Sequence, residues 1–227
     1  MAVISRAQSD EEVIILETLH HLRSISLHPF ITDQSGALSD EQYIASSARL
    51  SATIEILDEV KQKGEKALVF LESLDMQGSS ELPLILKTRY QMQQLPLVIN
   101  GSIAAVERQK RVERFQQGEG FDVMILSPRA GGVGLTLTAA NHVIHLSRWW
   151  NPAVEDQATD RIYRIGQTRP VHVYYPIAIH PALGEHSFDL KLHALIERKR
   201  QLSRSLLVPP SAGSYEINRL FKETVSG

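Results

Sequence analysis

The stretch FDVMILSPRAGGVGLTLTAANHVIHLS, residues 121–147, decides the fold class of this chain. It begins and ends with short apolar runs, FDVMILS and HVIHLS, and the glycine-rich PRAGGVG follows the first run at once. Apolar runs that are this short and do not alternate with polar residues are typical of strands buried on both faces. The stretch therefore predicts two buried strands, with a tight turn after the first.

Similar short apolar runs occur on both sides of this stretch. Further strands are predicted at KALVFL (66–71), LPLVI (95–99) and VHVYYPIAI (171–179). Helices are predicted at LPLILKTRYQMQQ (82–94), at SIAAVERQKRVERFQQG (102–118) with Ala105, Val112 and Phe115 facing inward, and at NPAVEDQATDRIYRIG (151–166). Strands that alternate with helices predict an α/β fold, with a mostly parallel sheet covered by helices on both faces.

The chain divides into three predicted segments: a helical prefix (1–63), the sheet domain (64–180), and a C-terminal helix with its tail (181–227). In the prefix, a helix is expected from Ser9 to Leu27, with Ser9 or Asp10 as the candidate cap. A second helix is expected from Ser39, because SDEQ has the capping-box pattern, with a break near residues 46–47.

Composition excludes several classes of protein. The 227 residues carry a formal net charge of -2, so any nucleic-acid contact must use local patches. Cysteine is absent, which excludes disulfides and thiolate metal sites, and the nine histidines lack a metal-binding spacing, so no metal site is expected. No apolar run approaches the roughly 18 residues that span a bilayer. Without a signal-peptide pattern at the N-terminus, a cytoplasmic protein with no membrane partner is expected.

A nucleotide site within the chain would be incomplete. An α/β domain that hydrolyses nucleotides usually carries G-x-x-x-x-G-K-[ST], in which backbone amides cradle the phosphates. No such stretch occurs, since GGVG lacks the following lysine, and no acidic metal-binding run follows a strand. The sequence therefore predicts no complete ATP site in this chain.

Two arginines, Arg161 and Arg164, are three residues apart in DQATDRIYRIGQ. In the predicted helix they share one face, and their permanently charged forks suit the phosphates of a nucleotide. This pattern indicates the arginine-finger role, and Gln157 and Gln167 can hold the loop or a hydroxyl. The alternative is a solvated face on which Asp156 and Asp160 pair with the arginines.

Two other patterns have open interpretations. The turn after residue 126 offers exposed amides that hold a phosphate, with Ser127 and Arg129 adding contacts, or it is an ordinary strand-to-helix turn. Trp149 and Trp150 pack in a core, or one indole stacks on a nucleic acid.

Taken in order, KALVF, INGS with RQKRVERF, ILSPRAGGVGLTLTAANHVIHLSRWWNP and EDQATDRIYRIGQTRPVHVY resemble the C-terminal motor lobe of the Swi/Snf family. These proteins are superfamily-two, helicase-like, DNA-stimulated ATPases. The resemblance covers roughly residues 47–175 and implies a RecA-like three-layer α/β/α fold. The tail resembles that of bacterial members, some of which belong to anti-phage systems.

The resemblance assigns roles by position. Arg161 and Arg164 match the arginines that reach ATP, and Gln157 matches the glutamine that opens their motif. The positions that match family contacts to DNA, or to the loop that couples DNA to the nucleotide, are Asn100, Gly101, Ser102, Ser127, Gly132, Gly134 and Trp150. The chain departs from the family pattern at Pro128–Arg129, at Thr136 and in VFLES, which puts those contacts in question.

The resemblance implies half of an ATP-driven translocase on double-stranded DNA. ATP with Mg²⁺ would be bound mainly by an N-terminal lobe outside this chain, so the chain alone is expected to be a fragment that hydrolyses no ATP. Expected partners are double-stranded DNA, that lobe, and proteins of a bacterial DNA-processing or anti-phage system. The alternative is a non-catalytic DNA-binding or docking module that keeps the fold. A strand-separating helicase fits less well, because no strand-splitting pin is recognisable.

Overall fold

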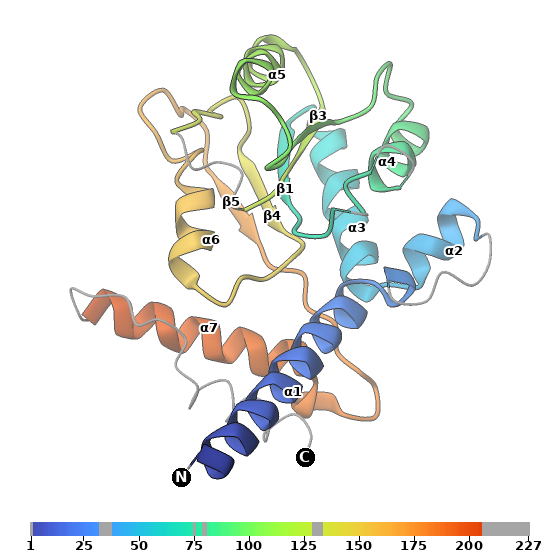
Figure 1. The fold of residues 1–227 in the computed structure, drawn as a ribbon. Coiled ribbons are helices and arrows are strands. Elements are labelled where there is room, and N and C mark those ends of the chain that lie inside the picture. Colours follow the sequence, from blue (N-terminus) through green and yellow to red (C-terminus); the bar gives the residue numbers. More distant parts are fainter. Residues whose placement is uncertain (1, 32–37, 75, 79–80, 129–133, 206–227) are drawn as a thin grey trace. The chain divides into compact units, whose positions relative to one another are not determined.

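The computed structural model of the protein describes residues 2–31, 38–74, 76–78, 81–128 and 134–205. The chain forms two compact units (Figure 1). The first, called here the sheet unit, comprises Leu50–Arg148 and Val154–Pro176. The second, the helical unit, comprises Met1–Arg49, Trp149–Ala153 and Ile177–Gly227. The division into three segments at residues 63 and 180 stays a prediction.

The sheet unit is built on a parallel sheet of five strands within the described residues. The strands are β1 (Lys66–Phe70), β2 (Leu97–Ile99), β3 (Asp122–Leu126), β4 (His142–His145) and β5 (His172–Tyr174), in the order β2-β3-β1-β4-β5. Every pair is parallel, which confirms the predicted α/β class and the parallel sheet. The carboxyl ends of the strands therefore meet at one edge of the sheet, called here the carboxyl edge.

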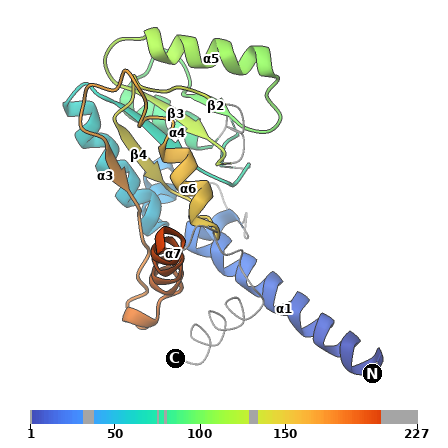
Figure 2. The ribbon, with the colours of Figure 1, turned by 90° about the vertical axis from the view of Figure 1, so that its left-hand side faces the viewer.

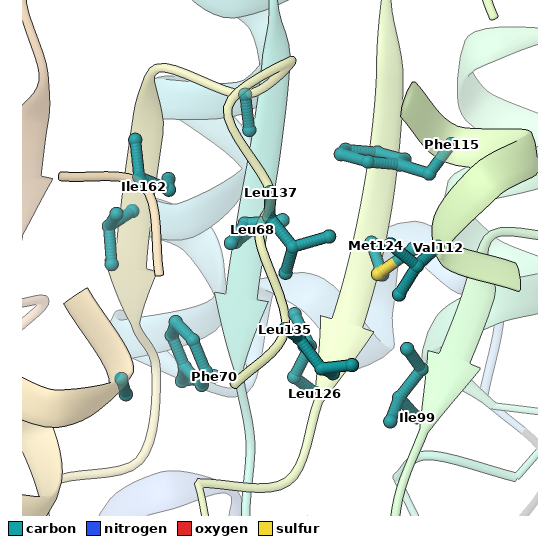
Figure 3. Close-up of a cluster of buried hydrophobic side chains, with 13 residues drawn as sticks. Leu68, Phe70, Ile99, Val112, Phe115, Met124, Leu126, Leu135, Leu137 and Ile162 are labelled. Carbon is teal, nitrogen blue, oxygen red and sulfur yellow. The ribbon is translucent and has the colours of Figure 1, made fainter. Parts of the chain in front are cut away.

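Helices cover both faces of this sheet, as expected for three layers. They are α3 (Ala48–Gln62), α4 (Leu82–Tyr90), α5 (Ala105–Gln117) and α6 (Pro152–Thr159). Figure 2 shows α3 and α5 on opposite sides of the strands. The buried cluster in Figure 3 joins one face of the sheet to α5 and α6; it includes Leu68, Phe70, Met124, Phe115 and Ile162. Truncating a fully buried phenylalanine such as Phe115 to alanine costs about 3–5 kcal/mol.

Two details of these helices differ from the sequence-based expectation. The helix expected over residues 82–94 ends at Tyr90, where Gln91 takes the left-handed conformation with φ of 52°. On α5, Val112 and Phe115 are buried as predicted, but Ala105 is exposed, so its inward placement was wrong. Ala105 is the first helical residue and lies beyond the stripe that packs on the sheet.

Strand β2 lies at one edge of the sheet, and a side chain from α5 binds one of its backbone carbonyls. Arg111 of α5 donates from Nη1 to the Val98 carbonyl at 2.6 Å. Its Nε donates to Glu107 at 3.0 Å, one turn back along the helix. The guanidinium is thus fixed across the middle residue of the edge strand.

His142 is the first residue of β4 and so lies at the amino ends of the strands, away from the carboxyl edge. It is fully buried between polar partners. Its Nε2 lies 2.6 Å from a carboxylate oxygen of Glu65, and its Nδ1 lies 3.1 Å from the Tyr174 hydroxyl. Burial is the main influence on the imidazole and lowers the pKa of His142. The hydrogen bond from His142 lowers the pKa of Glu65. With the ring neutral, Nε2–H donates to Glu65 and Nδ1 accepts from Tyr174.

The helical unit contains α1 (Ala2–Leu27), η1 (Pro29–Ile31), α2 (Asp40–Ala45), η2 (Gly184–His186) and α7 (Phe188–Ser205). The capping box at Ser39 is confirmed, because its hydroxyl accepts from the Gln42 amide and the Gln42 side chain accepts from the Ser39 amide. The break between α2 and α3 is confirmed as well. Helix α1 begins at Ala2 rather than Ser9, so the predicted cap at Ser9 or Asp10 was wrong, and both residues lie inside the helix.

A buried ion pair holds distant parts of the helical unit together. Arg49 donates from Nε and Nη2 to the two carboxylate oxygens of Asp189, and the two side chains are 3% and 1% exposed. The same carboxylate accepts from the Ser26 hydroxyl and the Ala178 amide. Segments more than a hundred residues apart in sequence therefore share one carboxylate.

In the part of the chain that the structure describes, no helix has the length and hydropathy needed to cross a membrane.

Candidate functional site

The two arginines flagged by the sequence do not lie on a helix. Helix α6 ends at Thr159, and the chain then tightens, with Ile162 N donating to Thr159 O. The Arg161 carbonyl accepts from the Leu137 amide at 3.0 Å, and Ile162 is fully buried. The helix predicted through Gly166 was therefore wrong beyond Thr159, because bonds to the β3–β4 connection replace the helical ladder.

Arg161 is buried and carries a charge that no described carboxylate neutralises. Arg161 is only 2% exposed, and its Cζ lies 5.6 Å from the centre of the Phe70 ring. Nη2 donates to the Pro128 carbonyl at 3.4 Å, while the buried Nη1 has no hydrogen-bond partner among the described residues. Burial, with the nearby charges of Arg164 and Arg108, lowers the pKa of Arg161 to about 10.

Arg164 is exposed and is bound to the other end of the same connection. Nη1 donates to the Gly134 carbonyl at 2.8 Å and to the Thr136 hydroxyl at 3.1 Å. Nε donates to the Asp160 backbone carbonyl at 3.3 Å. Within the described residues, neither arginine forms an ion pair with a carboxylate, so the alternative of pairing with Asp156 or Asp160 is not what the structure shows.

The two arginines therefore contact opposite ends of one connection. Arg161 touches Pro128, which follows β3, and Arg164 touches Gly134 and Thr136. Two residues assigned from sequence, Arg129 and Gly132, lie between these ends and outside the described residues.

Gln157 lies on α6 and is exposed; its carboxamide makes no hydrogen bond to another described residue. The structure places Gln157 four residues before Arg161, on the helix that leads into the arginine turn.

The turn after β2 and the turn after β3 are neighbours at the carboxyl edge. The Ser127 amide donates to the Ile99 carbonyl at 2.9 Å, which places Ser127 beside Asn100. The carboxamide of Asn100 is used inside its own turn: Oδ1 accepts from the amide and hydroxyl of Ser102, and Nδ2 donates to Gln77. Gly101 and Ser102 are exposed, so these two residues, rather than the Asn100 side chain, are open to a partner.

A groove of about 680 Å³ lies next to this turn, along β2 between α4 and α5. Asn100 and Gln77 line it, together with the cations Lys87, Arg111 and Arg114 and the acid Glu107. Positive side chains thus outnumber negative ones along the groove, which makes it compatible with an anionic partner.

The tryptophan pair belongs to the helical unit and is described there by itself. Trp149 is 9% exposed, and Trp150 is half-buried against a cluster of Leu19, Phe188, Leu192 and Ile196. The Arg23 guanidinium lies 5.7 Å from the centre of each indole. Core packing, the plain interpretation offered by the sequence, therefore applies to both rings, and only part of Trp150 is left for another contact.

Sequence reasoning missed the groups that hold the two arginines. Thr136 was noted only as a departure from a family pattern, and Phe70 only as part of a strand. The pairing of Arg49 with Asp189 was also missed. No local pattern marks these residues, because each contact joins segments that are distant in sequence.

Comparisons with known proteins show the family and the fold. The model of the helicase conserved C-terminal domain matches residues 48–166. Putative ATP-dependent helicase/translocase YwqA of Bacillus subtilis is 38% identical over 199 residues, which cover 86% of this chain and 20% of that protein. Zorya protein ZorD of Escherichia coli is also 38% identical over 199 residues, which cover 85% of this chain and 17% of that protein. The chain thus spans about a fifth of the length of these relatives.

Among solved structures, the Sulfolobus solfataricus SWI2/SNF2 ATPase core in complex with dsDNA is similar to this chain with a TM-score of 0.71 and 30% identity. The similarity covers 95% of this chain and 42% of that one. The C-terminal domain of the same ATPase gives a TM-score of 0.67 at 26% identity, with 95% and 82% covered.

Proposed function

The chain belongs to the helicase conserved C-terminal domain family and is a C-terminal lobe of the Swi2/Snf2 type, and on this premise we propose that it serves an ATP-driven translocase on double-stranded DNA. In this proposal ATP, with Mg²⁺, is held mainly by another part of a longer protein, the N-terminal motor lobe. Arg161 and Arg164 reach the nucleotide from this lobe, and Gln157 adds a contact.

The observation that carries the proposal is the state of the two arginines. One is buried with an unpartnered nitrogen, the other is exposed, and neither has a carboxylate partner among the described residues. The exposed Arg164 guanidinium, which is held in place without a counterion, is pre-positioned for an anion, and a triphosphate supplies charge that grows in the transition state. An arginine finger accelerates phosphoryl transfer by about 10³-fold or more.

The DNA contacts in this proposal lie at the carboxyl edge and on the helical unit. Gly101, Ser102 and Ser127 would contact the backbone of the tracking strand, with Asn100 shaping the turn and Trp150 contributing the exposed part of its indole. The cationic groove beside β2 would add sequence-independent attraction. The similar Sulfolobus solfataricus ATPase core was solved with double-stranded DNA, which supports DNA as the partner. Proteins of a bacterial DNA-processing or anti-phage system stay a proposal as further partners.

The test uses the longer natural protein that contains this chain and measures DNA-stimulated ATP hydrolysis. Arg164→Ala is expected to lower the turnover number by about 10³-fold. Arg89→Ala is the matched control, because that arginine is exposed and paired with Asp58, and its rate should stay close to the parent's. If Arg164→Ala stays within a factor of about two, the finger assignment is wrong. Salt-dependent DNA binding without any hydrolysis would instead support the non-catalytic module.

A further inference from the structure

The exposed Arg164 side chain is anchored at two of its three nitrogens. Nη1 donates to the Gly134 carbonyl and the Thr136 hydroxyl, at 2.8 and 3.1 Å, and Nε donates to the Asp160 carbonyl at 3.3 Å. Nη2 makes no hydrogen bond to any described residue, although the side chain is exposed. The group is therefore held on one side, and the two hydrogens of Nη2 have no acceptor among the described residues.

An exposed arginine without such anchors samples many rotamers, and ordering it costs conformational entropy that a ligand would otherwise supply. Three hydrogen bonds from the chain itself remove much of that cost before any ligand arrives. Preorganised donors of this kind are the ones that contribute most when charge develops in a transition state. Because these contacts lie on the surface, we infer that they hold Arg164 ready for a ligand rather than stabilise the fold.

Of these acceptors, only the one on Thr136 belongs to a side chain. The acceptors of Gly134 and Asp160 are backbone carbonyls and remain after substitution. A Cβ added at Gly134 would lie 3.8 Å from Arg164 Nη1, which is an ordinary contact, so an alanine there would not displace the arginine. Thr136 is exposed, so its hydroxyl can be removed without opening a cavity in the core.

We propose that Thr136 is a positioning residue for Arg164: its hydroxyl, with the Gly134 carbonyl, fixes Nη1 so that Nη2 is presented to a phosphate group. This inference rests on the proposed function, since the phosphate is that of the nucleotide. Thr136 lies on the β3–β4 connection, outside the turn that carries Arg161 and Arg164. The nucleotide would meet an arginine whose direction is set by the β3–β4 connection.

The first experiment measures the anchoring in this chain alone, without nucleotide. Nitrogen-15 NMR of the arginine side chains reports rotation about the Nε–Cζ bond, which slows when the terminal nitrogens are hydrogen-bonded. Thr136→Val keeps the branched shape and removes the acceptor, and is expected to accelerate rotation at Arg164. Thr136→Ser keeps a hydroxyl and should preserve slow rotation. Equal rotation in all three proteins would overturn the proposal, whatever the ATPase assays show.

The second experiment measures DNA-stimulated ATP hydrolysis in the longer protein. Thr136→Val is expected to lower kcat about three- to tenfold, the net worth of one hydrogen bond, with kcat/KM falling equally. Thr136→Ser should stay within a factor of about two of the parent protein. Thr138→Val is the control: it also loses a side-chain bond, to Gln116, but does not touch Arg164.

A double-mutant cycle separates positioning from a structural role. If Thr136 acts through Arg164, adding Thr136→Val to Arg164→Ala should change the rate by less than a factor of about two. An equal loss in both backgrounds would overturn the inference while leaving the finger assignment intact. An unaffected Arg164→Ala protein would instead reject the proposed function, and the NMR result would still stand on its own.

Discussion

The guanidinium carbon of Arg161 lies 5.6 Å from the centre of the Phe70 ring, inside the core of the sheet unit. The ring face offers a weak electrostatic partner, and Nη2 adds one bond to the Pro128 carbonyl. These contacts replace only part of the hydration that the charge has lost, which is why the pKa of Arg161 falls to about 10. The lobe thus carries an electrostatic cost at the position proposed to meet the nucleotide.

The first prediction follows from this cost. Arg161→Met keeps an unbranched apolar stem above Phe70 and removes the buried charge. We expect the free energy of unfolding to stay the same or rise by about 1 kcal/mol or more, because replacing buried ionic groups by apolar ones is often stabilising. Hydrolysis by the longer protein should be lost. Urea unfolding of the chain measures the first effect, and a clear loss of stability would show that the charge supports the fold.

The second prediction concerns acid and the His142–Glu65 pair. The pKa of buried His142 lies below its ordinary value of 6.5, so below that pH the unfolded chain binds a proton that the folded one does not. The pKa of Glu65 also lies below its ordinary value of 4.5, so a further loss follows below that pH. Both effects lower stability as the pH falls.

Melting temperatures measured between pH 7 and pH 5 test the histidine contribution. His142→Gln keeps a donor for Glu65 but cannot titrate, so its melting temperature should depend less on pH over this range. His186→Gln, at an exposed histidine, should keep the parent's slope. Parallel curves for all three proteins would show that His142 does not set the acid sensitivity.

The third prediction compares a buried ion pair with an exposed one. Asp189→Asn leaves the Arg49 guanidinium buried without its carboxylate, and we expect a loss of about 3–5 kcal/mol in the stability of the helical unit. Asp58→Asn breaks the exposed pair with Arg89, whose side chains are 40% and 37% exposed, and should cost at most about 1 kcal/mol. Denaturant unfolding followed by helical circular dichroism gives both values. Similar losses in the two variants would contradict the burial argument.

The fourth prediction separates packing from DNA contact at Trp150. Because this indole packs on the Leu19 and Phe188 cluster, Trp150→Ala should lower stability by about 2 kcal/mol, somewhat less than for a fully buried tryptophan. Trp150→Phe should recover most of that loss. Thermal unfolding and DNA binding are measured on the same samples. Unchanged stability with weakened DNA binding would assign the ring to DNA alone.

The strands were predictable from the sequence because burial on both faces leaves short, continuous apolar runs, as in KALVF and HVIH. The capping box at Ser39 was predictable because its bonds are local. The end of α6 was not, since the Arg161 carbonyl is taken by the Leu137 amide, a partner 24 positions back along the chain. The same limit applies to Arg49 and Asp189, which nothing local connects.

For the candidate site, the sequence indicated which residues matter but not how they are held. Arg161 and Arg164 were identified by type and spacing, yet one is buried and the other exposed. Asn100 was identified too, but its carboxamide turns inward to Gln77 and Ser102. Residue types suggest chemistry, whereas solvent exposure and hydrogen-bond partners depend on contacts that only the folded chain brings together.

The Arg111 bond to the Val98 carbonyl has a consequence for how copies of this protein behave in a crowded cell. A bare outer strand invites a neighbouring molecule to extend the sheet and so to start an aggregate. Here the acceptor at the middle of the short strand is already occupied, and a bulky charge stands in front of it. Replacing Arg111 would free this carbonyl, and we expect the variant to aggregate more readily than the parent protein.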